Sequence, residues 1–133
     1  MIGQKFYIEK YDWQVMVLYE VGSSDTNMVM YMLKSICNDE DILNNAYESV
    51  SNGKPNTGFT YSDYDSHASF VVIGKTTSIP EMVNTIVHEA NHLKSHIATT
   101  YDIDEKGEEV CYLIGDIVKN MYEVFRKFLI INT

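Results

Sequence analysis

The sequence predicts an α+β fold in a single domain, residues 1–133, with a small antiparallel or mixed sheet and several helices. Its length suffices to bury one core without disulfides or metals as staples. Short runs rich in β-branched and aromatic residues predict strands, whereas longer stretches with helical spacing of apolar residues predict helices. The predicted order is one strand, two helices, a strand hairpin and two helices, which is an α+β arrangement.

The first half of the chain predicts one strand followed by two helices. Residues 13–21 (WQVMVLYEV) are β-branched and aromatic, which favours a strand, and the turn-forming residues 22–25 follow it. Residues 27–37 have helical spacing with three methionines, which are typical core-filling side chains. A second short helix is expected at residues 39–50, before an Asn-Gly-Lys-Pro sequence that ends it.

The middle of the chain predicts a β-hairpin. Residues 58–61 form a short strand-like run, and residues 68–73 (ASFVVI) form a stronger one. The link at residues 62–66 is polar and rich in turn-forming residues. We therefore expect the two strands to pair.

Two long helices are expected at the C-terminal end, at residues 79–98 and 108–130. Ser78 and Glu81 have the spacing of a helix capping box, and Pro80 falls in the first turn, where its missing N–H does no harm. Apolar residues follow one face of each helix. We expect both helices to pack on the small sheet.

The charge balance restricts the partners of the protein. Ten Lys and Arg residues against 19 Asp and Glu residues give a net charge of −9. Such a surface repels phosphate groups, so nucleic acid and anionic lipid are disfavoured as partners. The chain has neither an apolar run of about 18 residues that could span a membrane nor an apolar secretory segment near Met1. We expect a cytoplasmic location.

An H-E-x-x-H motif, His88-Glu89-Ala90-Asn91-His92, lies within the helix predicted at residues 79–98. Residues four apart project from the same side of a helix, so His88 and His92 have the spacing of two ligands of one tetrahedral zinc. Glu89 lies about 100° around the helix from His88, beside such a metal. There it could accept a proton from a zinc-bound water and later donate it to a leaving amine.

With this motif, the sequence resembles the zincin metallopeptidases, and more closely their gluzincin branch. The resemblance covers about residues 78–119. It implies a minimal zincin-like domain that binds one Zn2+ per chain through His88 and His92. It also implies a catalytic Glu89 that activates the zinc-bound water for attack on a peptide carbonyl. In zincins the substrate pairs with an edge strand near this helix, and residues 68–73 are the expected edge strand here.

The gluzincin resemblance further implies that a glutamate on the following helix is the third zinc ligand. Glu108 matches the glutamate-led helix of small phage-type metallopeptidases, whereas helical phase favours Glu109. His96 is a rival ligand, but His88 and His96 would be about 12 Å apart along a straight helix. His67, in the hairpin, is a weaker alternative.

Taken together, these patterns predict a zinc-dependent hydrolase that acts on a peptide or protein substrate. The alternative is a non-catalytic zinc-binding or protein-interaction module with the same fold, since 133 residues leave little room for a second lobe. Tyr101 and Tyr112 are candidate donors to the oxyanion of the transition state. The sequence identifies neither the substrate nor an oligomeric state.

Overall fold

The computed structural model describes residues 1–131 and contains every predicted helix and strand, together with one strand that the sequence analysis missed. The elements are β1 (Ile2–Ile8), β2 (Trp13–Val21), α1 (Thr26–Leu33), α2 (Glu40–Asn52), β3 (Gly58–Asp63), β4 (Ala68–Gly74), α3 (Ile79–Thr100) and α4 (Glu108–Ile131). The missed strand is β1, in which only Ile8 is buried, so its sequence carries a weak apolar pattern.

The four strands form one mixed sheet in the order β1-β2-β4-β3. β1 is antiparallel to β2, β2 is parallel to β4, and β3 is antiparallel to β4. The prediction that residues 68–73 form the edge strand is therefore wrong, because β4 lies between β2 and β3. The sheet edge next to the motif helix is β3, and the two strands of the predicted hairpin pair as expected.

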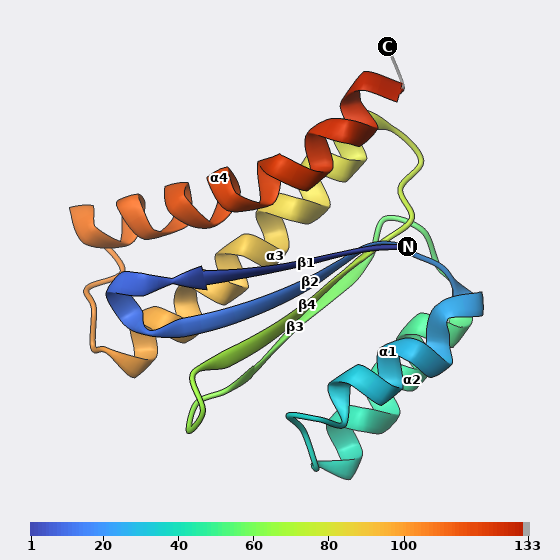
Figure 1. Ribbon diagram of the computed structural model, residues 1–133, viewed down its shortest axis with the longest axis horizontal. Coiled ribbons are helices and arrows are strands. Elements are labelled where there is room, and N and C mark those ends of the chain that lie inside the picture. The colour runs from blue at the N-terminus through green and yellow to red at the C-terminus, as the bar shows by residue number, and fades with distance from the viewer. Residues whose placement is uncertain (132–133) are drawn as a thin grey trace.

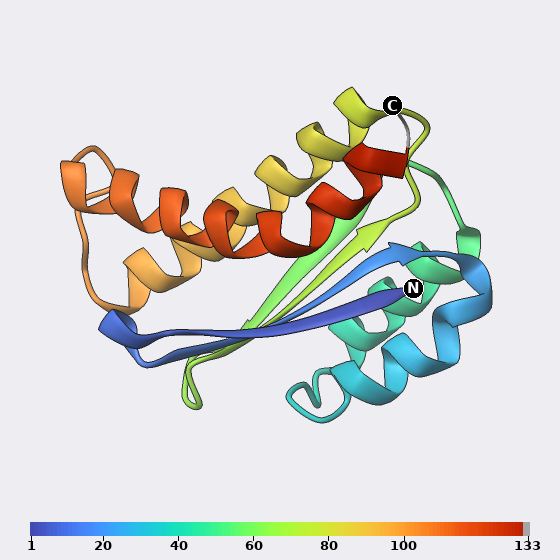
Figure 2. The same ribbon diagram turned by 45° about the horizontal axis from the view of Figure 1, so that its top comes forward.

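The helices cover both faces of this sheet (Figures 1 and 2). α3 and α4 lie side by side on one face, and α1 and α2 lie against the other. The first core includes Val15, Val17, Val71, Ile73, Ile86, Leu93, Ile117 and Met121. The second includes Leu18, Val29, Leu33, Leu43, Val50, Phe70 and Val72. The α+β class and the packing of a mixed sheet on α3 and α4 are confirmed.

β4 shows why its sequence is almost continuously apolar. Val71 and Ile73 point into the core under α3 and α4, whereas Phe70 and Val72 point into the core under α1 and α2. Successive side chains of a strand point to opposite faces, and here both faces are buried. A central strand, not an edge strand, has this pattern.

The start of α3 follows from its capping residue. The Ser78 hydroxyl accepts a hydrogen bond from the Glu81 N–H at 3.2 Å, and Pro80 occupies the first turn. From there α3 crosses the sheet beside α4 and extends to Thr100. Within residues 1–131, none of the helices has the length and apolar character that crossing a membrane requires.

Candidate functional site

His88 and His92 lie on the outer side of α3, and both side chains are exposed. Their Nε2 atoms are 3.2 Å apart, and the two ring planes meet at 74°. The spacing of four residues along one helix brings the rings together, because it is just over one helical turn. The predicted convergence of the two imidazoles is therefore present in the structure.

The distance between the two nitrogens can be compared with the geometry of zinc. Two histidine nitrogens on one tetrahedral zinc, each about 2.0–2.1 Å from it, lie about 3.3–3.4 Å apart. The observed 3.2 Å between His88 Nε2 and His92 Nε2 is close to this value. The spacing of the pair therefore fits two positions of a tetrahedral zinc site.

Glu89 points to a different side of the helix, toward the edge strand β3. Glu89 is only 3% exposed. The Thr60 hydroxyl on β3 donates a hydrogen bond to Glu89 Oε1 at 2.8 Å. A Cβ atom at Gly58 would stand 3.2 Å from Glu89 Cγ and 3.4 Å from Oε2. A side chain larger than hydrogen at position 58 would therefore crowd the carboxylate.

One carboxylate oxygen of Glu89 remains available. Thr60 engages Oε1, whereas Oε2 accepts no hydrogen bond from the residues that the structure describes. Within the same residues, no fully buried side-chain oxygen or nitrogen lacks a hydrogen-bond partner. Oε2 therefore keeps some contact with solvent, which a group that exchanges protons with water requires.

His96 lies one helical turn beyond His92 and is half-buried. Its Nδ1 atom is 2.6 Å from the Ser62 hydroxyl of β3. Desolvation by burial lowers the pKa of His96, and the charge of neighbouring His92 lowers it further. His96 is thus half-buried and is anchored to the edge strand by its contact with Ser62.

His67 is held in the hairpin by aromatic contacts. Its ring stacks on Trp13 with the centroids 5.0 Å apart, and its Nδ1 is 3.3 Å from the Tyr101 hydroxyl. Its φ of 54° lies in the left-handed region, consistent with its place in the tight turn between β3 and β4. The contacts with Trp13 and Tyr101 account for the position of the His67 ring without a metal.

The two glutamates predicted as third ligand open α4. Glu109 Oε1 is 3.3 Å from the Lys10 ammonium group, and both side chains are well exposed. α3 continues eight residues beyond His92, which is about 12 Å along its axis, before the loop that leads to Glu108. Among residues 1–131, the structure brings no three His, Cys, Asp or Glu side chains into a group that could hold a metal ion. The third ligand stays a prediction.

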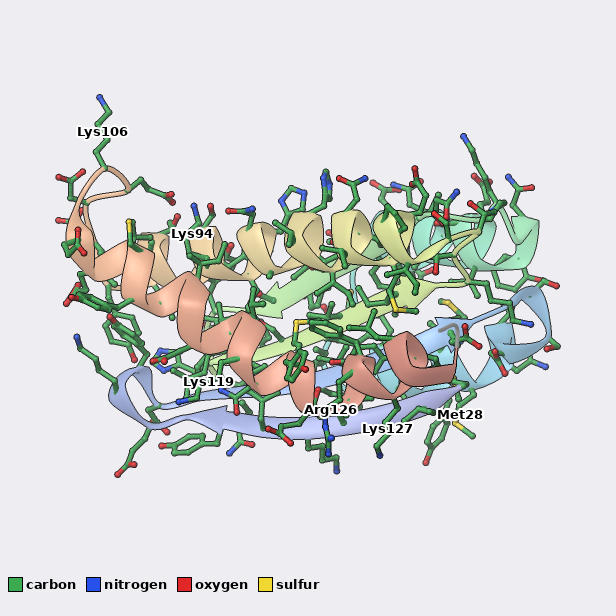
Figure 3. All side chains as sticks on the ribbon, turned by 90° about the horizontal axis from the view of Figure 1, so that it is seen from above. Met28, Lys94, Lys106, Lys119, Arg126 and Lys127 are labelled. Atoms are coloured by element: carbon green, nitrogen blue, oxygen red, sulfur yellow. The ribbon has the colours of Figure 1, made fainter. Side chains whose placement is uncertain are left out.

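The loop between α3 and α4 is fastened to α3 by an ion pair. Lys94 Nζ lies 2.9 Å from Glu105 Oε2, and the Lys94 side chain is largely buried. Figure 3 shows Lys94 on α3 and Lys106 at the tip of this loop. The loop therefore has a defined position at the end of the helix pair that carries Glu108 and Glu109.

The two tyrosines that the sequence offered as oxyanion donors are engaged elsewhere or fully exposed. The Tyr101 hydroxyl donates a hydrogen bond to the backbone carbonyl of Tyr11. Tyr112, on the first turns of α4, is 70% exposed. The sequence analysis instead missed three residues of β3 that face α3: Gly58, Thr60 and Ser62. The sequence signal that could have identified these residues is the small or hydroxyl-bearing side chain at every second position of the strand.

A cavity formed by the described residues lies away from this motif. Its volume is about 600 Å³, and it lies beside α1 on the other face of the sheet, lined by Lys5, Gln14, Met16, Met32, Ile36 and Phe70 among others. No family model, curated protein or solved structure matches the chain. The candidate site is therefore defined by its own geometry: an exposed histidine pair on the outer side of α3, and a buried glutamate and a third histidine that contact the edge strand β3.

Proposed function

We propose that this protein is a zinc-dependent hydrolase, specifically a metallopeptidase with a zincin-like site on α3. The observation that carries this proposal is the 3.2 Å separation of His88 Nε2 and His92 Nε2. It matches two ligand positions of a tetrahedral zinc, with Glu89 on the next position of the same helix. The resemblance to gluzincins supports Glu108, or alternatively Glu109, as the third ligand.

The chemistry divides between the metal and Glu89. Zinc bound by the histidine pair would supply Lewis-acid chemistry, polarising a substrate carbonyl and making a water molecule easier to deprotonate. Glu89 would take the proton from the attacking water and pass it to the leaving amine. Thr60 supports this role, because its hydrogen bond to Oε1 fixes the carboxylate and leaves Oε2 for the proton.

The edge strand β3 supports a peptide as the substrate. β3 is the outer strand on one side of the sheet, and α3 packs against it. An edge strand offers unpaired backbone N–H and C=O groups to an extended peptide. A peptide bound along β3 would lie beside Glu89, since Thr60 of that strand contacts the carboxylate.

Metal binding tests the proposal first. We expect one zinc per chain in the purified protein by elemental analysis, and loss of this zinc in His92→Ala. Asn91→Ala is the matched control, because Asn91 is exposed on the same helix and its side chain, among the described residues, hydrogen-bonds to the Val87 carbonyl. Absence of zinc from the wild-type protein, even after supplementation, would contradict the proposal.

Catalysis is tested separately with Glu89→Gln. We expect hydrolysis of fluorescein-labelled casein to fall by about 10²- to 10⁴-fold, the usual contribution of a general base. Zinc content should stay unchanged, because Glu89 is not a ligand. The amide oxygen of the new side chain can still accept the Thr60 hydrogen bond, so folding should be retained. A variant as active as the wild type would show that the mechanism is wrong.

A second candidate is a non-catalytic zinc-binding or protein-interaction module. The burial of Glu89 and its hydrogen bond to Thr60 favour it, because both also suit a purely structural carboxylate between α3 and β3. One zinc per chain without hydrolysis of any peptide, in wild type and Glu89→Gln alike, would support this candidate.

A further inference from the structure

A chain of hydrogen bonds leads from the core of the protein to His96. The Trp13 indole Nε1–H donates to Ser69 Oγ at 2.8 Å. Ser69 Oγ is 2.6 Å from Ser62 Oγ, which in turn is 2.6 Å from His96 Nδ1. β2, β4, β3 and α3 each contribute one of these four residues, so the chain crosses three neighbouring strands.

The first member sets the direction of this chain. An indole N–H can only donate, so Ser69 accepts from Trp13 and must place its own hydrogen elsewhere. Among the described residues, its remaining partner is Ser62 Oγ. Ser62 therefore accepts from Ser69 and donates its own hydrogen to His96 Nδ1. A neutral imidazole that accepts at Nδ1 carries its hydrogen on Nε2.

The opposite direction leaves a hydrogen without an acceptor. If His96 donated from Nδ1 to Ser62, Ser62 could either donate to Ser69 or accept a second hydrogen bond from it. In the first case the Ser69 hydroxyl hydrogen, and in the second case the Ser62 hydroxyl hydrogen, would have no partner within the described residues. Trp13, Ser69 and Ser62 are 0%, 3% and 6% exposed, so water does not replace the missing acceptor. An unpaired buried donor is costly, which favours the first direction.

The tautomer decides what His96 can do. A nitrogen that carries a hydrogen cannot ligate a metal, and Nδ1 is already bound to Ser62. The His96 ring centroid lies 6.5 Å from that of His92 and 5.7 Å from that of Tyr64. Its Nε2–H group is therefore a hydrogen-bond donor beside the His88–His92 pair rather than a third ligand.

We propose that the Trp13-Ser69-Ser62 chain holds His96 as its Nε2–H tautomer, and that His96 donates this hydrogen to a carbonyl oxygen of the ligand at the histidine pair. The inference rests on the proposed function and deepens it. A fixed donor aimed at an oxygen that gains negative charge stabilises that charge. In this role His96 contacts substrate, whereas Trp13, Ser69 and Ser62 are positioning residues.

Long-range 1H–15N correlation NMR of the ¹⁵N-labelled protein tests the tautomer. We expect a single Nε2–H form for His96 in the wild type and a mixture of tautomers in Ser69→Ala and in Ser62→Ala. Ser95→Ala is the control, since the Ser95 hydroxyl is not part of the hydrogen-bonded series from Trp13 to His96. Added zinc should shift the ring nitrogens of His88 and His92 and leave the His96 tautomer unchanged. An Nδ1–H form, or direct coordination of zinc by His96, would overturn the inference.

The donor role is tested with two substitutions of His96. Removing one such donor costs about 10²- to 10³-fold in kcat, so we expect this loss in casein hydrolysis by zinc-loaded His96→Ala. His96→Gln places an amide N–H near the original Nε2 and should recover part of the loss. Both variants should keep one zinc per chain. Wild-type activity in His96→Ala, or loss of its zinc, would contradict the donor role.

A second probe separates this inference from the proposed function. If zinc-loaded wild type does not cleave casein, the peptidase proposal fails, and acetohydroxamate then serves as the carbonyl ligand. We expect His96→Ala to bind it about tenfold more weakly than wild type, the usual effect of losing a hydrogen bond to a charged group. Equal affinities would show that His96 does not donate, whatever the activity.

Discussion

The two sides of α3 are built differently. On the outer side, His88 and His92 are exposed and contact each other, with their Nε2 atoms 3.2 Å apart. On the side that faces β3, Glu89 and His96 are each fixed by a hydroxyl group of the strand, Thr60 at 2.8 Å and Ser62 at 2.6 Å.

This difference separates local from tertiary causes. The helical repeat by itself brings the histidine pair together, because residues four apart are neighbours on a helix surface. Glu89 and His96 depend on contacts with a strand some 30 residues earlier in the sequence. Changes on the outer side should therefore affect metal binding with little effect on stability. Changes at the strand contact should affect both stability and the catalytic groups.

The largest effect on stability is expected for Gly58→Ala. The added Cβ would come within 2.4 Å of the Val72 carbonyl oxygen and 3.2 Å of Glu89 Cγ, so β3 must shift. We expect the free energy of unfolding to fall by about 3 kcal/mol, at the upper end for overpacking. Chemical denaturation measures this change. Activity should fall as well, because the shift displaces Thr60 from Glu89.

Gly115→Ala is the matched control for this variant. Gly115 is exposed on α4, and a Cβ there would meet no atom within 4 Å. Replacing glycine by alanine in a helix should raise the free energy of unfolding by about 0.5–1 kcal/mol. Equal effects of the two substitutions would show that the close approach of β3 to Glu89 is unimportant.

A smaller loss is expected for Thr60→Val. This substitution keeps the shape of the side chain and removes the hydrogen bond to Glu89 Oε1. We expect a loss of about 1.5 kcal/mol in unfolding free energy, because a buried carboxylate loses a donor. Thr99→Val, which removes a hydrogen bond to the Ser95 carbonyl of the same helix, should change stability much less. Identical denaturation midpoints for these two variants would contradict the role of Thr60.

The smallest effect on stability is expected for His88→Ala. His88 is exposed, and alanine has the higher helix propensity, so unfolding free energy should change by no more than about 0.5 kcal/mol. Zinc binding, measured by isothermal titration calorimetry, should nevertheless be lost. A variant that is strongly destabilised and still binds zinc would contradict the assignment of metal binding, and not stability, to the outer side of α3.

Much of the secondary structure could be predicted from the sequence, because each element carries a local signal. Ser78 and Pro80 mark the start of α3, and the β-branched run of β4 marks a strand. β1 was missed because an edge strand with one buried residue shows little apolar pattern. The edge position expected for residues 68–73 was also wrong: pairing between β2 and β4 depends on contacts across some 50 residues, which no local pattern reveals.

The sequence by itself determined the H-E-x-x-H spacing, and with it the convergence of His88 and His92, because helix geometry is local and periodic. The partners of the other groups were decided only by the tertiary structure. Thr60 and Ser62 reach Glu89 and His96 because β3 is the edge strand beside α3, and Glu109 meets Lys10 because α4 begins near β1. Such contacts follow from strand order and helix packing. Both depend on interactions between residues that are distant in the sequence, so no local pattern determines them.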